Sequence, residues 1–466
     1  MKAQDIHLVW IRRDLRITDH TALFEATKND AKVVLVFVFD TKILNLLPDK
    51  EDQRVDFIFQ SLCDLNKQLE KYDTKIIIRH GDPIKEIPYV AQELGVTSVY
   101  FNEDYEPYAK ARDQEVKGSL TKLNIKSFSF RDHIIFGSQI LKPDQTPYVV
   151  YTPYKNTWLK KLKPLHWEEK RPQYNFVKVK DLKGLAKKIT LREIGFSSHS
   201  TYYKSQNPSR SAAIQRLKEF SQNLSHYKEN RDFPALDEAT SLISPFLRFG
   251  LISVRECLRT IVKLKNEGAR TWMSELIWRE FFIMIMDMYP HVVNSSFKIQ
   301  YKNLKWENNK EWFDKWKSGN TGFPIVDAGM RQLNKTGWMH NRVRMIVASF
   351  LVKDLLIDRR WGEQYFAEKL IDFELASNNG NWQWCASTGC DAQPYFRIFN
   401  PSLQSERFDK NAEYIKFWIP ELSQISPKEI HHPEDSDLQN KSTYPKPIIS
   451  HSVQKQKALR LFNPKK

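Results

Sequence analysis

The segment LIDFELASNNGNWQWCASTGCDAQPYFRIFNP, residues 370–401, combines side chains that seldom occur together. It holds two carboxylates, three asparagines and two tryptophans: Asp372, Glu374, Asn378, Asn379, Asn381, Trp382 and Trp384. An apolar core does not need the amides, and a solvated loop does not need the tryptophans. A planar, polar-edged ligand needs both, because it stacks on aromatic walls and is oriented by a few placed donors and acceptors. The segment therefore predicts a buried ligand site.

The composition favours a polyanionic partner. The chain of 466 residues carries a formal net charge of +16 at pH 7. Phosphates that are neutralised by lysine and arginine release counterions and so drive association. A generally basic, well-solvated surface is the alternative reading. The 13 tryptophans favour nucleic acid, because aromatic rings stack on exposed bases.

Other classes of protein are not expected. The longest clean apolar run, VVLVFVF at residues 33–39, is far shorter than the roughly 18 residues of a membrane span. The N-terminus lacks the layout of a signal peptide, so we expect a soluble cytoplasmic protein without a membrane partner. The cysteines are scattered (Cys63, Cys257, Cys385 and Cys390) and predict reduced thiols and no metal site.

The first part of the chain predicts an α/β domain. Residues 6–130 alternate short β-branched runs with amphipathic stretches. We expect parallel strands over 7–13, 33–39, 75–80 and 98–101, and crossover helices over 52–72 and 83–95. This pattern indicates a doubly wound, Rossmann-like domain over residues 1–130. No GxGxxG follows the first run, so a dinucleotide in the usual phosphate loop is not expected.

The remaining chain changes character twice. Residues 131–205 are rich in proline, aromatic residues and lysine, which indicates a long surface connector. Its lysines either follow DNA or only keep the connector solvated. Over residues 206–466 a helical period dominates and predicts an all-α domain. Helices are expected over 241–253, 269–288, 326–338 and 340–358, and the tail after Pro420 should be loosely held.

Two groups of polar and aromatic residues fall at helical spacing. They are Trp272, Glu275, Trp278 and Arg279, and then Trp338, Asn341, Arg344 and Met345. Each group would form a stripe on one helix, with polar side chains where a core would have leucine. One interpretation is a purely structural role, as a salt-bridge network between helices. The other reading is a ligand site, because buried charges must be paired or bound.

Five segments carry a resemblance to a known family: HLVWIRRDLRITDH from residue 7, SELIWREFF from 274, TGWMHNRVRM from 336, ASNNGNWQW from 376 and STGCDAQPYFRIFNP from 387. The chain resembles the DNA photolyase/cryptochrome family, and within it the microbial class I cyclobutane pyrimidine dimer photolyases. The resemblance implies a monomeric lyase, without an obligate protein partner, that repairs thymine dimers in UV-damaged DNA under blue light. Its α/β domain would be the antenna domain, and its helical domain would bind FAD and DNA.

The same resemblance implies the mechanism and its residues. Excited reduced flavin, FADH⁻, would give one electron to a flipped-out dimer, and the electron would return after the dimer splits. Residues implied to bind FAD are Tyr227, Thr240, Ser241, Leu242, Ile243, Ser244, Trp272, Glu275, Arg279, Asn341, Arg344, Asp372, Glu374 and Asn378. Arg344 and Asp372 would form an ion pair along the flavin, and Asn378 would face its N5 atom. Glu374 departs from the family's pattern, which has aspartate there.

Residues implied to bind the lesion and its phosphates are Trp278, Arg279, Asn341, Arg342, Met345, Trp384 and Arg397. Of all these residues, the catalytic ones would be Glu275, Asn341, Met345 and Asn378. Electrons for flavin reduction usually pass along three tryptophans, of which Trp382 and Trp306 match the proximal and distal members. Arg359 stands where the middle one is expected, so we expect photoreduction to be slow or rerouted through Trp361 or a nearby tyrosine.

A second, antenna chromophore is left open. The folate-binding relatives have an Asn-Glu pair and a Cys-Lys pair at the positions here held by Tyr108, Ala109, Val293 and Asn294. The carboxylate that would bind folate (MTHF) is therefore missing, which disfavours folate. A deazaflavin, a flavin or no antenna remain.

Three other functions explain the sequence less well. A cryptochrome-like photoreceptor would bind FAD without repairing DNA, but it would tolerate loss of the lesion residues, which all stand here. A (6-4) photolyase would have a histidine pair in WMHNRVRM, where position 341 is asparagine. A nucleic-acid-binding protein without a cofactor would not explain residues 372–384.

Overall fold

The computed structural model of the chain describes residues 5–198, 202 and 206–463. They form two compact units, each assembled from separate stretches of sequence. The first comprises Met1–Ile140, Lys155–Gln222 and Ser241–Asp287, and the second Leu141–Tyr154, Asn223–Thr240 and Met288–Lys466. The expected domain boundaries at residues 130 and 205 stay predictions. Parts of the expected segments (1–4, 199–201, 203–205 and 464–466) lie outside the described residues.

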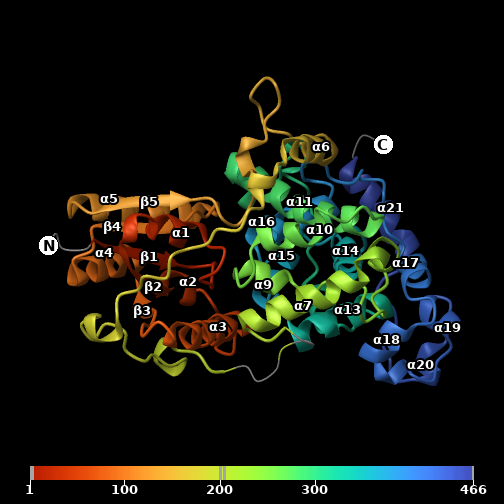
Figure 1. Cartoon of the computed structure of the whole chain (residues 1–466). Coiled ribbons are helices and arrows are strands. Elements are labelled where there is room, and N and C mark those ends of the chain that lie inside the picture. Colours follow the sequence, from red (N-terminus) through yellow and green to blue (C-terminus); the bar gives the residue numbers. More distant parts are fainter. Residues whose placement is uncertain (1–4, 199–201, 203–205, 464–466) are drawn as a thin grey trace. The chain divides into compact units, whose positions relative to one another are not determined.

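The first unit contains a parallel sheet (Figure 1). Its five strands run in the order β3-β2-β1-β4-β5 and all pair in parallel. They are β1 Ile6–Ile11, β2 Lys32–Asp40, β3 Ile77–Gly81, β4 Ser98–Asn102 and β5 Lys126–Phe130. Val9 and Trp10, on opposite faces of the central strand, are both buried. The predicted α/β sheet is confirmed; the unpredicted β5 is a half-exposed edge strand, KSFSF, without an apolar run.

From the N-terminus to residue 288, the α-helices are α1 Thr21–Ala26, α2 Thr41–Leu44, α3 Gln53–Glu70, α4 Pro83–Leu94, α5 Pro107–Lys122, α6 Tyr151–Lys161, α7 Arg210–Asn223, α8 Tyr227–Asn230, α9 Ser244–Arg248, α10 Val254–Ile261 and α11 Glu267–Met288. The expected crossover helices are confirmed as α3 and α4. Each begins at an aspartate whose side chain accepts a hydrogen bond from the helix backbone: Asp52 from Arg54 N and Asp82 from Ile84 N. Gly95 ends α4 at φ +65°, a backbone conformation that favours glycine.

The second unit is helical and continues with α12 Lys310–Ser318, α13 Pro324–Thr336, α14 Asn341–Ser349, α15 Arg359–Lys369, α16 Leu375–Cys385, α17 Pro401–Phe408, α18 Glu413–Trp418, α19 Pro427–His431, α20 Leu438–Lys441 and α21 His451–Phe462. Helix α13 packs against α12 and α14, and α15 packs against α16. Within the described part of the chain, no helix has the length and apolar character that crossing a membrane requires.

Two expected helices are shorter than the sequence indicates. Only Ser244–Arg248 is helical within residues 241–253, because Leu242 and Gly250 both have positive φ, +53° and +68°. A side chain at Gly250 would lie 2.2 Å from the carbonyl oxygen of Arg13, so close packing requires glycine there. Over 340–358, α14 ends at Ser349 and a π-helical turn, Phe350–Asp354, follows. The expected helices at 269–288 and 326–338 are confirmed as α11 and α13.

The expectation of a loosely held tail after Pro420 is wrong. The side chain of Tyr444 is 1% exposed, and its hydroxyl donates to the buried carboxylate of Asp327. His451 at the start of α21 lies with Nδ1 2.5 Å from Oδ1 of Asp354. Widely spaced anchors in a polar segment produce no periodicity, so the sequence pattern did not indicate this packing.

Candidate functional site

The segment from Asp372 to Trp384 folds mainly as α16. Its asparagines have different hydrogen-bond partners. Asn378 donates to the carbonyl oxygen of Glu363 at 2.9 Å. The amide of Asn379 donates to Val292 O at 3.0 Å and to Glu363 Oε1 at 2.8 Å. Asn381 is exposed. Asn379 is therefore structural. Asn378, 8% exposed, keeps its amide oxygen for another donor.

The ion pair that the resemblance implies is present. Nη2 of Arg344 donates to Oδ2 of Asp372 at 2.9 Å, and Nε of Arg344 donates to the carbonyl oxygen of Met339 at 2.7 Å. The Asp372 side chain is 5% exposed and that of Arg344 is 23% exposed. Two hydrogen bonds thus hold the guanidinium in one plane, with part of it accessible. Glu374 precedes α16, is buried, and accepts from the hydroxyl of Ser377 at 3.0 Å.

Helix α14 begins directly after a buried histidine. Nδ1 of His340 accepts from the backbone N–H of Arg342 at 3.1 Å and so caps the helix. Burial lowers the pKa of His340 to about 3, so the ring is neutral at pH 7. Asn341, in the first turn, is exposed and its amide nitrogen lies 3.9 Å from Sδ of Met345. Asn341 and Met345 therefore lie on the same face of α14, as their spacing predicts.

Two details of α14 differ from the sequence interpretation. Trp338 precedes the helix instead of lying on it, because α13 ends at Thr336 and α14 starts only at Asn341. The expected single stripe that included Trp338 is therefore wrong. Arg342, implied to contact phosphate, already pairs with Asp232 at 2.8 Å and lies over the ring of Phe408.

The first stripe lies on one helix, α11, as predicted, and this part of α11 belongs to the first unit. Trp272 is buried against Phe220, whereas Glu275, Trp278 and Arg279 are half-buried. Nη1 of Arg279 donates to the carbonyl oxygen of His133 at 2.7 Å. The ring of Trp278 contacts the rings of Phe281 and Phe282, which lie one helical turn further along α11.

The buried carboxylate of α11 is Glu280, which the sequence interpretation missed. Its side chain is surrounded by four N–H donors at 2.7–3.0 Å: Ile135 N, Phe136 N, Gly137 N and Trp158 Nε1. A carboxylate so satisfied is a structural anchor. The available signal was its place directly before the apolar run FFIMIM, residues 281–286, because a charge beside buried apolar residues needs partners.

The implied phosphate-binding segment is divided between the two units. Tyr227, which is buried, and Thr240 belong to the second unit, and Ser241, Leu242, Ile243 and Ser244 to the first. Nε of Arg216 donates to Ser241 O at 2.9 Å, and Nε2 of Gln206 donates to Leu242 O at 3.1 Å. Ser244 opens α9, so the serine-rich stretch does stand at a helix start.

The implied electron-transfer residues occupy different places in the second unit. Trp382, 2% exposed, has ring contacts with Trp316 and Phe366. The ring of Trp306 meets Phe462, and that of Trp361 meets Phe313. Trp384, implied to contact the lesion, is half-buried on α16.

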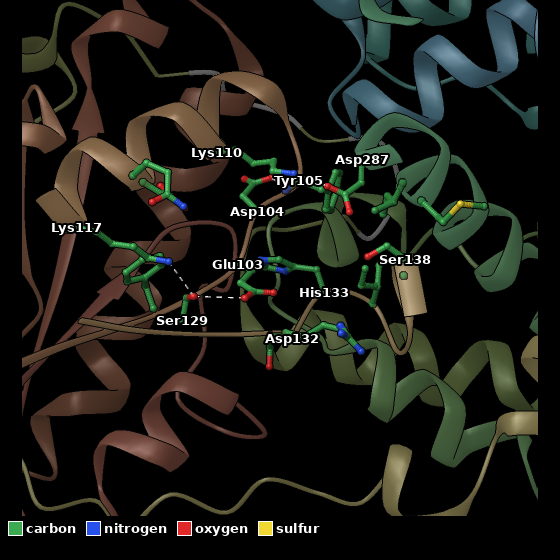
Figure 2. Close-up of a pocket in the computed structure, with 18 residues that line it drawn as sticks. Glu103, Asp104, Tyr105, Lys110, Lys117, Ser129, Asp132, His133, Ser138 and Asp287 are labelled. Atoms are coloured by element: carbon green, nitrogen blue, oxygen red, sulfur yellow. Dashed lines mark hydrogen bonds and ion pairs between the residues drawn. The ribbon is translucent and has the colours of Figure 1, made fainter. Parts of the chain in front are cut away.

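A polar pocket of about 260 Å³ lies in the first unit, lined by α5, the segment after β5 and the end of α11 (Figure 2). Its charges largely compensate one another: Nζ of Lys110 lies 2.6 Å from Oδ1 of Asp287, and Lys117 donates to Ser129, which donates to Glu103. Burial lowers the pKa of His133, which also lines the pocket, to about 3. Sequence reasoning missed this pocket, since its residues are far apart in the chain.

Arg397 is exposed and lines a groove of about 500 Å³ in the second unit, together with Asn400 at the start of α17 and Lys455 of α21. The groove is open and basic. Among the described residues, no group of three or more histidine, cysteine, aspartate or glutamate side chains is placed to hold a metal ion.

Comparisons with known proteins match both parts of the chain. Residues 7–173 match the family model described as DNA photolyase, and residues 272–464 match the model described as the FAD binding domain of DNA photolyase. The chain is 36% identical to a deoxyribodipyrimidine photo-lyase from Synechococcus sp., over 98% of this chain and 96% of that protein.

Two solved structures have the same fold. A class III photolyase from Agrobacterium tumefaciens superposes with a TM-score of 0.86 at 31% identity, covering 100% of this chain and 98% of that chain. A cryptochrome from Synechocystis sp. superposes with a TM-score of 0.86 at 27% identity, covering 99% of this chain and 100% of that chain. The chain therefore belongs to the DNA photolyase/cryptochrome family.

Proposed function

We propose that the protein is a deoxyribodipyrimidine photo-lyase, which repairs cyclobutane pyrimidine dimers in UV-damaged DNA under blue light with reduced FAD as its cofactor. One observation carries the proposal beyond family membership. In the second unit, α14 packs against α16. The implied lesion residues of α14 therefore share these two packed helices with the oriented Arg344–Asp372 pair and with Asn378, whose amide nitrogen is hydrogen-bonded.

The residues of the second unit fit a flavin. Arg344 is held flat by two hydrogen bonds and offers a partly exposed cation, which suits a planar, polar-edged ring. The amide nitrogen of Asn378 is already bonded to Glu363 O, so the amide is fixed in orientation and neutral. A neutral amide does not repel a negatively charged cofactor. When bound and reduced, FAD would supply a light-excited one-electron donor to which the electron returns.

The chain's own residues would bind and orient the lesion. Arg397 would neutralise a backbone phosphate. In the first unit, the resemblance assigns the half-buried ring of Trp278 and the carboxyl group of Glu275 to the lesion. In the second unit, it assigns the half-buried ring of Trp384 and the amide of Asn341 to the lesion. Extrusion of the dimer costs less than extrusion of an intact pair, because a damaged step is already poorly stacked and paired.

The second chromophore remains part of the proposal. At the position where folate binders have asparagine, the hydroxyl of Tyr108 donates to Oδ2 of Asp40 at 2.8 Å. Ala109, at the position of their glutamate, is 4% exposed and offers no carboxylate. These observations support an antenna other than folate, or none.

Repair of a thymine-dimer oligonucleotide by the dithionite-reduced protein tests the proposal. We expect HPLC to show intact thymines after blue light and none after darkness. A flavin-loaded protein that binds the oligonucleotide and repairs none of it in light would refute repair. That result would favour a photoreceptor, the second candidate, which the likeness to the Synechocystis cryptochrome supports.

A matched pair of variants on α11 tests the lesion site. Glu275→Ala is expected to lower the quantum yield of repair by about tenfold, since it removes a hydrogen bond that forms with the reacting dimer. Glu267→Ala on the same helix removes an exposed carboxylate paired with Arg270 and is the control. Equal repair by both variants would exclude Glu275 from the site.

A further inference from the structure

Position 359 in this chain holds a buried, paired cation. Arg359 is 3% exposed, pairs with Glu363 on the same helix, and donates from Nη2 to the carbonyl oxygen of Ser295 at 3.3 Å. A guanidinium keeps its charge at all accessible pH values and does not give up an electron as an indole does. Trp306 has one ring contact within the described residues, with Phe462. A tryptophan route through position 359 is therefore interrupted.

Trp316 of α12 offers a different neighbour to Trp382. It is 0% exposed, and its ring centroid lies 6.2 Å from that of Trp382 at an interplanar angle of 68°. Its Nε1–H donates to the carbonyl oxygen of Val347 at 3.1 Å, so one orientation of the ring is fixed. A buried indole in edge contact with Trp382 is the kind of group that can pass an electron to it.

Aromatic contacts continue from Trp316 toward the surface. Phe313 stacks on Trp316, with centroids 5.8 Å apart and an interplanar angle of 14°. The half-exposed Trp361 then meets Phe313 at 5.2 Å. Phenylalanine is not oxidised under these conditions, but its ring fills the space between the two indoles. The contacts thus join buried Trp382 to an indole that solvent reaches.

Tyr365 is a second candidate for the residue that ends the electron route. Its ring centroid lies 5.9 Å from that of Trp316. A tyrosine loses its hydroxyl proton when it is oxidised, so it needs a proton acceptor. The Tyr365 hydroxyl donates to the amide oxygen of Asn334 at 2.6 Å, and burial raises its pKa to about 12. An amide oxygen is a poor base. Trp361 does not depend on such a partner, because its indole reaches water.

We propose that Trp316 relays electrons from Trp361 to Trp382, so that this chain reduces its flavin by a route that bypasses Arg359. The inference rests on the proposed function. It deepens that function, because it assigns Trp316 a role that neither the family matches nor the sequence pattern gives it.

Trp382 gives one electron to the light-excited oxidised flavin, Trp316 refills Trp382, and Trp361 refills Trp316. The oxidised indole of Trp361 releases its N–H proton to water. An added thiol then returns an electron and a proton to Trp361 and becomes a thiyl radical, and two thiyl radicals combine as a disulfide.

Photoreduction of the oxidised holoprotein with dithiothreitol under blue light tests the route. Trp316→Phe and Trp361→Phe are each expected to slow flavin reduction by about tenfold or more. Trp312→Phe is the matched control, because Trp312 lies on the same helix α12 and is half-buried. Slow reduction in Trp306→Phe together with a normal rate in Trp316→Phe would overturn the proposal.

A spectroscopic measurement locates the radical independently of the rate. In protein made with ring-deuterated tryptophan, the light-induced EPR signal should change its hyperfine pattern, whereas ring-deuterated tyrosine should leave it unaltered. The signal should also be lost in Trp361→Phe, a substitution at a half-exposed position. A signal that responds to labelled tyrosine would overturn the choice of Trp361.

Two further results separate this inference from the proposed function. Dithionite-reduced Trp316→Phe should still repair a thymine dimer in light, and failure of the unmodified protein to do so concerns the proposed function alone. Adding Arg359→Trp with Glu363→Gln to Trp316→Phe places an indole at position 359 and leaves no unpaired carboxylate. Faster photoreduction in this triple variant than in Trp316→Phe is expected, and an unchanged rate would count against interruption at Arg359.

Discussion

At the scale of single residues, the contact between Gly362 and Trp382 decides how closely α15 approaches α16. A Cβ at Gly362 would lie 2.2 Å from Cη2 of Trp382 and 2.6 Å from Cδ2 of Leu351. Neither group can withdraw easily, because Trp382 and Leu351 are both buried. The absent side chain is thus what lets the indole of Trp382 lie against the helix that carries Trp361.

Gly362→Ala should therefore destabilise the protein by about 1–3 kcal/mol, through overpacking. Urea unfolding measures the change. Gly118→Ala on α5 is the control: no atom lies within 4 Å of a Cβ there, and alanine should stabilise the helix by about 0.5–1 kcal/mol. A Gly362→Ala protein as stable as the unsubstituted one would show that Trp382 repacks freely.

At the scale of elements, α14 depends on a histidine that must stay neutral. The pKa of His340 is lowered mainly by burial, and Arg342, Arg344 and Arg231 lower it further, whereas Asp232 raises it. The unfolded chain binds a proton below about pH 6.5 that the folded protein accepts only near pH 3. Stability from this group is therefore fully present above pH 6.5 and is lost as the pH falls toward 3.

His340→Asn should remove this pH dependence, because asparagine caps a helix and does not titrate. Between pH 6.5 and 4.5, urea unfolding of the unsubstituted protein should lose up to about 1.4 kcal/mol per pH unit more than the variant. His226→Asn, at an exposed position, serves as the control. Parallel pH profiles for His340→Asn and the unsubstituted protein would contradict the assignment.

The tail is a second element whose docking depends on few contacts. The hydroxyl of Tyr444 donates to Asp327, which also accepts from the N–H and hydroxyl of Thr321 and from Gly322 N. Tyr444→Phe leaves that buried carboxylate with one donor fewer, so unfolding should become easier by about 1–3 kcal/mol. Thermal unfolding checks this against Tyr89→Phe, at a residue that is 44% exposed, where the change in stability should stay within about 0.5 kcal/mol. Equal Tm values for the two variants would show that the Tyr444–Asp327 hydrogen bond does not stabilise the docked tail.

At the scale of the whole molecule, the net charge of +16 should make DNA binding strongly dependent on salt. Fluorescence anisotropy of a dimer-containing duplex, at several NaCl concentrations, gives the slope of log K against log salt. Arg397→Ala should reduce the magnitude of this slope by about 0.9, since one phosphate contact is lost.

Arg171→Ala is the matched control, because Arg171 belongs to the expected connector and its side chain is 82% exposed beside Glu169. An equal fall in slope for both variants would show that the connector contacts DNA as well. An unchanged slope for Arg397→Ala would exclude the groove at α17 from the DNA-binding surface.

The sequence alone determined the fold class, four of the five strands, the two crossover helices and the helices α11 and α13. These elements are encoded locally, since the strands are short apolar runs, the helices repeat apolar residues at a period of 3.6, and aspartates begin α3 and α4. It also determined the family, and through it the Arg344–Asp372 pair, whose members stand 28 residues apart in the chain. The roles of the implied site residues stay predictions.

Only the tertiary structure decided features that join distant parts of the chain. Glu280 finds its donors more than a hundred residues away, Tyr444 anchors a tail that has no periodicity, and Trp316 meets Trp382 from another helix. Trp338 left its expected stripe because α14 starts later than helical spacing suggested. A sequence pattern reports which face of an element is apolar, but not which distant residue packs on it, because that depends on how the whole chain closes around its core.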